Sequence, residues 1–266
     1  MRGIRLAGLI AITVVVTIAV MSQPPIAQPA SYHRFADDRA LLGVPSFLNV
    51  VSNVVYVLAG GAGLWVLLRS PAAGHACGPL CLGWADRVTF GTLFLGVLLT
   101  AFGSTWYHLG PCNATLVWDR LPMTVAFMGF ACGLVADRIN ARAGAYLLLP
   151  LVALGIASVL YWNATEQHGA GDLRPYILVQ AMPLLLVPYI AAVWPGRYLP
   201  RGGLFIALGW YVLGKVLEVG DGVVFALGGV LSGHTLKHLA TAVGVYWVAR
   251  AIRRGAGGAG RGASRV

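Results

Sequence analysis

Apolar stretches about as long as a bilayer is thick recur along the whole sequence, and they constrain the fold more than any other feature. A helix crosses the hydrocarbon core of a membrane with about 20 mainly apolar residues. This pattern predicts helices at 47–68, 88–108, 115–136, 144–162, 173–194, 203–227 and 233–252. A shorter apolar run covers 6–21. We therefore expect an all-α polytopic membrane protein, with a bundle of seven transmembrane helices and an additional N-terminal helix.

The composition excludes an ordinary soluble protein. Of the 266 residues, 58% are hydrophobic and only 11% are charged, whereas soluble domains carry about a quarter charged residues. The formal net charge is +10, which by itself would be compatible with nucleic-acid binding. The basic residues, however, stand in short loops and in the C-terminal tail, where membrane topology explains them better. We expect no nucleic-acid partner.

The N-terminal stretch resembles a signal sequence. Arg2 and Arg5 precede a short apolar core, but no clear A-x-A cleavage site follows it, which favours an uncleaved signal anchor over a cleaved peptide. We expect a signal or anchor segment with a linker at 1–30, the seven-helix membrane domain at 31–254 and a flexible basic tail at 255–266.

The distribution of basic residues predicts the orientation in the membrane. With residue 1 inside, thirteen Lys and Arg residues fall in cytoplasmic stretches and six in outer stretches or outer helix ends. Basic residues favour the cytoplasmic side, so we expect a cytoplasmic C-terminus. A bacterial inner membrane fits the charged start of the chain, although a eukaryotic secretory membrane would give the same topology.

Five polar residues inside the apolar stretches form the candidate site. They are Ser104, His108, Asp119, His234 and His238. A spacing of four places the first two on one face of a helix, and it does the same for the last two. In the predicted orientation all five lie within about two helical turns of the outer surface. Ionisable groups are costly in a membrane, so such a cluster indicates a functional site.

Three imidazoles on two facing helices are typical zinc ligands that leave one coordination position open. We therefore expect Zn²⁺ at His108, His234 and His238. Zinc with three protein ligands binds a water molecule and lowers its pKa to about 7. Asp119 is then the candidate general base. Ser104 is the candidate donor to the oxyanion, or a second-sphere group that holds the water or a histidine ring.

The same motifs resemble the alkaline ceramidases and, more broadly, the CREST superfamily, which also contains the progestin and adipoQ receptors. The similarity covers about 35–254 and lies in FGSTWYH at 102–108, WDRLP at 118–122, SGHTLKH at 232–238 and FLNVVSN at 47–53.

The resemblance implies a seven-helix bundle with zinc held by His108, His234 and His238, and with Ser104 and Asp119 beside the open position of the metal. It further implies hydrolysis of the amide of a ceramide-like membrane lipid to a sphingoid base and a fatty acid. Acyl-chain specificity and oligomeric state stay open.

One departure from the family concerns calcium. Eukaryotic members carry a calcium-binding acid just before the stretch that matches 47–53. Here that position is Ser46, and the nearby acids are only Asp37 and Asp38. This difference argues against a calcium site.

Other functions remain open from the sequence. The chain could be a receptor-like or structural protein whose zinc only ties helices together. A metal transporter would need ligands along a path through the membrane, whereas these cluster at one end. Ligation of haem by a histidine pair is a further alternative.

Several polar residues also have purely structural interpretations. Asp119 could be an acid favoured by the start of a helix, and Ser104 could bond backward to its own helix. Lys215 and Glu218, three residues apart, are expected to form an ion pair, and Asp221 lies nearby. Tyr107 is expected to be an interfacial anchor, like its tryptophan neighbours.

Two further residue types have structural interpretations. Asn49 and Asn53 are expected to bond between helices. The four cysteines predict no disulfide framework, and the CxxxC pair Cys77 and Cys81 is a weak metal signal.

Overall fold

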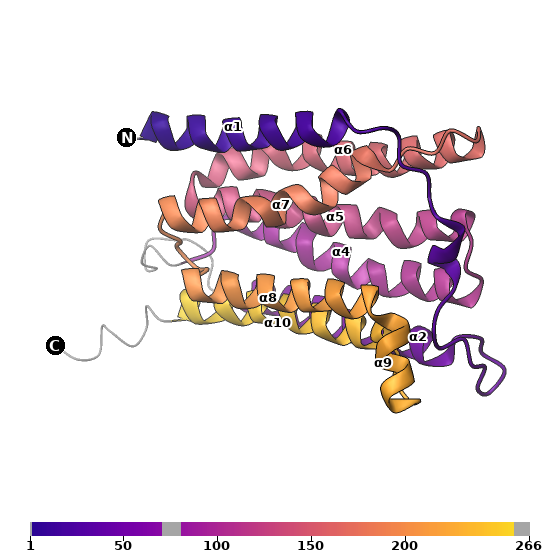
Figure 1. Ribbon diagram of the computed structural model, residues 1–266. Helices are drawn as coiled ribbons and strands as arrows, with labels where there is room; N and C mark the ends of the chain where they lie inside the picture. The colour runs from indigo at the N-terminus through magenta and orange to yellow at the C-terminus, as the bar shows by residue number, and fades with distance from the viewer. Residues whose placement is uncertain (1, 71–80, 258–266) are drawn as a thin grey trace.

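The computed structural model describes residues 2–70 and 81–257, and within them it confirms the all-α bundle (Figure 1). The described part of the chain contains no strand. A short 3₁₀ helix, η1 (Ala30–His33), precedes the bundle. The long helices are α1 (Arg2–Met21), α3 (Val54–Arg69), α4 (Trp84–Leu109), α5 (Asn113–Arg138), α6 (Ala141–Gln167), α7 (Arg174–Val193), α8 (Arg201–Val219) and α10 (Gly233–Gly257). Two short helices, α2 (Phe47–Ser52) and α9 (Asp221–Gly228), complete the set.

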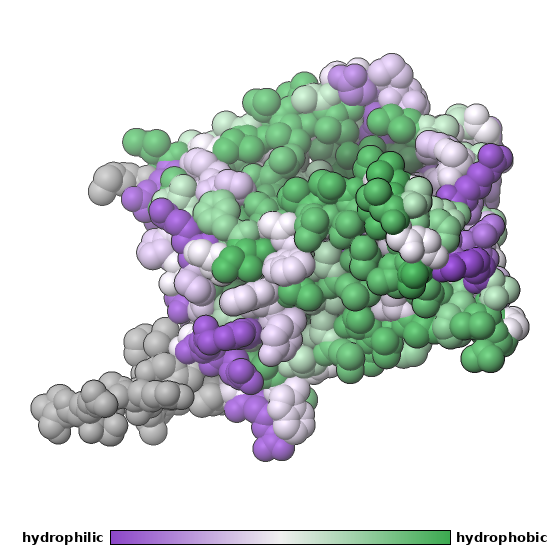
Figure 2. All heavy atoms as spheres, turned by 60° about the horizontal axis from the view of Figure 1, so that its bottom comes forward, coloured by the Kyte–Doolittle hydropathy of each residue, from purple (hydrophilic) through white to green (hydrophobic). Residues whose placement is uncertain are grey.

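The protein is an integral membrane protein by the length and composition of its helices. Seven stretches are long and apolar enough to cross a membrane: α1, α2 with α3, and α4 to α8. Large apolar side chains, such as Leu58, Leu68 and Leu149, are exposed along these helices. Figure 2 shows apolar side chains covering the middle of one face, with hydrophilic ones gathered toward its ends. Such a surface suits lipid better than water.

Helix α10 is not among these seven stretches, although it was predicted as the last span. It carries His234, Lys237 and His238 near its start and three arginines near its end, which lowers its hydropathy. It nevertheless packs against α8 and α3, and it runs antiparallel to α8 over most of its length (Figure 1). Leu239 and Tyr246 are exposed on its other side, so the bundle covers one face of this polar helix.

The predicted helix 203–227 is wrong in its extent. Helix α8 ends at Val219, and after Gly220 the chain turns into α9, which points away from the bundle axis (Figure 1). The reason lies in Asp221, whose two carboxylate oxygens accept hydrogen bonds from the backbone N–H groups of Ala36 and His234, at 2.8 and 2.7 Å. Asp221 thus joins the start of α10 to the N-terminal segment.

The predicted helix 47–68 is present but interrupted at Asn53, which separates α2 from α3. The amide of Asn53 donates to the backbone carbonyls of Asn49 and Val50, so its expected interhelical bond is not found. Asn49 does bond between helices, because its side-chain oxygen accepts from Thr235 at 2.8 Å. One of these two predictions is therefore confirmed.

The end of α4 and the start of α5 are in close contact. A Cβ atom added at Gly103 would collide with the backbone carbonyl oxygen of Trp118. Only glycine allows the two helices to approach this closely. The approach places Ser104 of α4 next to Asp119 of α5, so the packing of two backbones sets the position of two predicted site residues.

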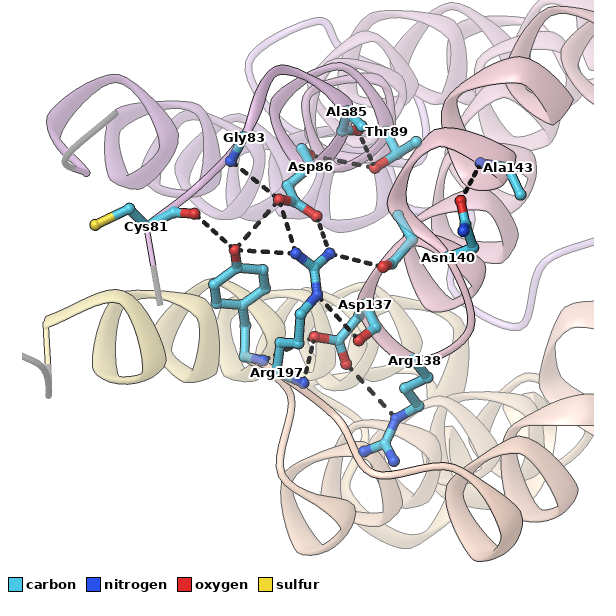
Figure 3. Close-up of polar contacts among 12 residues, drawn as sticks. Cys81, Gly83, Ala85, Asp86, Thr89, Asp137, Arg138, Asn140, Ala143 and Arg197 are labelled. Atoms are coloured by element: carbon cyan, nitrogen blue, oxygen red, sulfur yellow. Dashed lines mark hydrogen bonds and ion pairs between the residues drawn. The ribbon is translucent and has the colours of Figure 1, made fainter. Parts of the chain in front are cut away.

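A buried ionic network occupies the opposite end of the bundle (Figure 3). Arg197, in the loop after α7, donates to Asp86 of α4 at 2.5 Å. Asp137 at the end of α5 accepts from the backbone N–H groups of Arg197 and Tyr198, at 3.0 and 2.7 Å. Burial raises the pKa of Tyr198 in this loop to about 12, and the negative charge of Asp86 adds to the effect. The network ties α4, α5 and the α7–α8 loop together.

Candidate metal centre

Three histidine side chains converge at the end of the bundle where α4 ends and α10 begins. His108 lies in the last turn of α4, and His234 and His238 lie in the first turns of α10. All three are buried, with exposed fractions of 1%, 5% and 1%. One nitrogen from each ring lies within 4.8 Å of those from the other two. Residues more than a hundred positions apart thus meet as the helical spacing predicted.

The spacing of the nitrogens fits a metal ion. The Nε2 atoms of His108 and His234 are 3.2 Å apart. Tetrahedral zinc with Zn–N bonds of about 2.0–2.1 Å places its nitrogen ligands roughly 3.3–3.4 Å from one another. Neutral imidazole nitrogens are also the donors that zinc prefers in such sites. The His108–His234 distance therefore suits a shared metal ion, and the three histidines together form a group that could hold one.

Two neighbouring contacts hold the α10 histidines in place. The hydroxyl of Ser52, in α2, lies 2.7 Å from Nδ1 of His238, which leaves Nε2 of that ring facing the cluster. Metal-binding histidines are commonly oriented by such a bond to the second ring nitrogen. The bond from the backbone N–H of His234 to Asp221 fixes the start of α10. Nδ1 of His108, in contrast, is buried without a hydrogen-bond partner.

Asp119 of α5 and Ser104 of α4 are neighbours of each other. Ser104 is one helical turn before His108 on α4, and its side chain is within hydrogen-bonding reach of the Asp119 carboxylate. Asp119 lines a cavity inside the bundle. The structure therefore brings the three predicted histidines together, and it places Asp119 next to the turn of α4 that precedes His108.

A segment that the sequence analysis left without a role covers the outer side of the histidines. Phe35 packs against the rings of His108 and His234, with centroid distances of 4.7 and 4.6 Å.

His33 lies 2.9 Å from both the hydroxyl of Tyr107 and the side-chain oxygen of Asn113. Tyr107 is buried here, so its prediction as an interfacial anchor is wrong. No periodic pattern in the sequence predicts that the segment with His33 and Phe35 packs on the end of α4.

Two hollows adjoin the site. A cavity of about 280 Å³ extends between α5, α7, α8 and α10, and most of its lining residues are apolar. A second pocket of about 410 Å³ lies at the outer side and is lined by Phe35, Asp221 and His234 among others. Tyr32 and Glu218 line both. An amphiphilic molecule could therefore place its tail in the cavity and its polar part near the histidines.

The predicted ion pair between Lys215 and Glu218 is confirmed, and it has a third member. Lys237 of α10 donates to Oε1 of Glu218 at 2.8 Å, while Lys215 pairs with Oε2. All three side chains line the apolar cavity. The sequence analysis did not foresee the contact of Lys237, because it joins residues on different helices.

The two acids nearest to Ser46 in the sequence differ in their surroundings. Asp37 is buried and pairs with Arg39, whose hydrogen bond holds the pKa of the Asp37 carboxyl below its usual value of 3.8. Asp38 is exposed. Asp37 is thus already neutralised by an arginine.

None of the described cysteines belongs to the histidine cluster. Cys112 and Cys132 are free thiols, and Cys81 is disulfide-bonded, which the sequence analysis did not foresee. Cys77, the other member of the weak CxxxC metal signal, lies outside the described residues.

No protein-family model matches this chain, and no curated protein sequence matches it either.

Proposed function

We propose that the protein is a zinc-dependent membrane hydrolase that cleaves the amide bond of a ceramide-like lipid, an N-acyl sphingoid base, and releases a free amine and a fatty acid. The observation that carries this proposal is the convergence of three buried imidazoles, together with an apolar cavity whose lining includes Asp119 and Lys237, the residue before His238. Metal ligands, a carboxylate and a compartment for a lipid tail then occupy one place. In the predicted orientation this place faces the periplasmic side of a bacterial inner membrane.

The chemistry of amide hydrolysis assigns a task to each residue. Zinc held by His108, His234 and His238 would supply a Lewis acid that activates water and polarises the carbonyl. Asp119 accepts a proton from the attacking water and returns it to the leaving amine. The contact of Ser104 with Asp119 supports a role for its hydroxyl in orienting that carboxylate.

The cavity supports a lipid as the substrate. Its walls include Val97, Phe130 and Val248, which offer no hydrogen bonds and suit a hydrocarbon chain. Its polar lining includes Asp119 and Lys237. A lipid amide would thus be held with its acyl chain among apolar side chains and its amide near the histidines.

A second candidate function is a receptor-like or structural membrane protein with a non-catalytic zinc site. The contact of Phe35 with two of the histidine rings favours it, because an aromatic side chain on the outer face of the cluster restricts access of water. In that case the metal would join α4 to α10 and perform no chemistry.

Metal analysis combined with a ceramide hydrolysis assay on the purified protein tests the proposal. We expect about one zinc ion per chain in the wild type, and loss of both zinc and activity in His238→Ala. His168→Ala is the matched control, because His168 is exposed and bonds only to the carbonyl of Ala164. Asp119→Ala should keep zinc and lose activity. Zinc retention without hydrolysis of any lipid amide would favour the structural alternative.

A further inference from the structure

The chain contains only two lysines, Lys215 and Lys237, among its 19 basic residues. They belong to different helices, α8 and α10, yet both bind the carboxylate of Glu218. The remaining basic residues are arginines, most of which stand in loops and at helix ends. Both lysines of the protein thus lie in the wall of the internal cavity, beside the candidate metal centre.

Positive charges outnumber negative ones along this cavity. Its charged lining residues are Asp119, Arg120, Lys215, Glu218 and Lys237, three cations against two carboxylates. An uncompensated charge in a low-dielectric environment is costly, so a surplus cation calls for an anionic partner.

Arg120 is one of these three cations, and one of its donor atoms has no hydrogen-bond partner. Its side chain is 5% exposed, and its Nη1 atom is buried without a hydrogen-bond partner. Its Nη2 atom donates to Gln28 at 2.6 Å, and the guanidinium lies over the rings of Trp162 and Tyr176. The aromatic rings hold this cation in place while one of its donor groups remains unused.

The lysines lie where the polar part of a lipid would be. Glu218, to which both are bound, lines the apolar cavity and also the outer pocket that includes His234. Lys237 directly precedes His238 in α10. A lipid with its acyl chain in the cavity therefore has its amide near the histidines and the rest of its polar half near Lys215 and Lys237.

We propose that the acyl amide cleaved at this site carries an anionic group, a carboxylate or a phosphate, on its amine half, and that Lys215 and Lys237 bind this group. The proposal rests on the proposed amide hydrolysis and narrows its substrate class. In the reaction, water adds across the C–N bond: its oxygen enters the fatty acid carboxylate, and the amine leaves with a proton. The anionic group takes no part in the bond changes and serves recognition.

A pair of lipids that differ only in charge tests this proposal. N-lauroylglycine and N-lauroylethanolamine share the acyl chain and the amide, but only the first carries a carboxylate. We expect the full-length protein in neutral detergent to bind N-lauroylglycine about tenfold more tightly by calorimetry, because a hydrogen bond to a charged group contributes about that factor. The phosphate ester of N-lauroylethanolamine, as a third ligand, distinguishes phosphate from carboxylate recognition.

Substitutions at the lysines locate the effect. Lys215→Met should remove most of the preference for the charged lipid, and Lys215→Arg should keep it. Arg142→Met is the matched control, since Arg142 is an exposed cation at the opposite end of the bundle. If Lys215→Met does not fold, the binding of N-lauroylglycine to Glu218→Gln tests the anion site instead. This substitution should tighten binding of N-lauroylglycine, because the competing carboxylate is gone, and unchanged or weaker binding would contradict the proposal.

Hydrolysis of the same lipids separates this proposal from the proposed function. Binding that depends on charge and on Lys215, without cleavage of any amide, would support the anion site and refute the hydrolase. Cleavage of ceramide and N-lauroylethanolamine as fast as N-lauroylglycine, with equal affinities, would support the hydrolase and overturn the anion site.

Discussion

The two ends of α4 show two different ways of burying charged and polar groups. Asp86 in its first turn and His108 in its last turn are both almost fully buried, about 33 Å apart along the helix axis. At the Asp86 end, carboxylates meet arginines from other elements (Figure 3). At the His108 end, three imidazoles face one another, and Nδ1 of His108 has no partner.

The buried side-chain atoms that lack hydrogen bonds also have different surroundings at the two ends. At the Asp86 end, Oδ2 of Asp137 and Nε of Arg138 lack hydrogen bonds but face each other as an ion pair at 3.6 Å, and Nε of Arg250 lacks one although its guanidinium lies over Trp247. At the His108 end, Nη1 of Arg120 has no hydrogen-bond partner. Buried polar groups in native proteins are nearly always satisfied, so exceptions need an explanation. The Asp86 end, whose carboxylates are paired with arginines, is called the saturated end below, and it holds the helices together. The His108 end is called the unsaturated end, and a ligand is expected there.

Asp119→Asn gives the largest expected effect at the unsaturated end. Loss of the general base should lower the rate of lipid amide hydrolysis by about 10²–10⁴-fold. The zinc content and the melting temperature should stay near those of the wild type, because Asp119 is not a ligand in this account. Hydrolysis rates and metal content of the same preparation measure both. An unchanged rate would remove Asp119 from the chemistry.

Asp137→Ala should have the opposite profile at the saturated end. It leaves Arg138 buried without its ion-pair partner and removes the acceptor for the backbone of Arg197 and Tyr198. Breaking a buried ion pair costs about 3–5 kcal/mol, so thermal unfolding in detergent should shift strongly downward. Activity per folded molecule should be retained. A stable but inactive variant would show that this end also serves function.

Ser52→Ala should have a smaller effect, on metal affinity. The variant removes the bond that orients the ring of His238, and outer partners of this kind contribute about 10–100-fold to metal affinity. Competition with a chelator measures the change. Ser70→Ala is a matched control, because that serine bonds to the carbonyl of Val66 at the other end of α3. Equal affinities in the two variants would exclude the role of Ser52.

The smallest expected effect concerns pH and the segment that covers the histidines. The pKa of Asp37 is lowered in the folded protein by Arg39, so this pair stabilises the fold above the usual carboxyl pKa of 3.8. The contribution is lost as the pH falls below that value toward the lower folded-state pKa. Thermal unfolding of Asp37→Asn should therefore depend less on pH in this acidic window than the wild type. Identical pH profiles would contradict the assignment.

The sequence predicted those parts of the molecule that follow a repeat along one helix. The apolar runs predicted the helices, and the spacing of four between His234 and His238 predicted one shared face. The contact of Lys237 with Glu218, the bond from Ser52 to His238 and the position of Phe35 depend on how separate elements pack. No local pattern encodes them. The end of α8 was missed for the same reason, since Asp221 bonds to partners that are distant in sequence.

X-ray absorption at the zinc edge of the purified protein tests the central claim most directly. The account predicts a zinc ion with three imidazole nitrogens at about 2.0–2.1 Å and one oxygen donor, and loss of this signal in His108→Ala. A protein that binds no zinc when purified in its presence, or that binds it with the same spectrum after His108→Ala, would contradict the account.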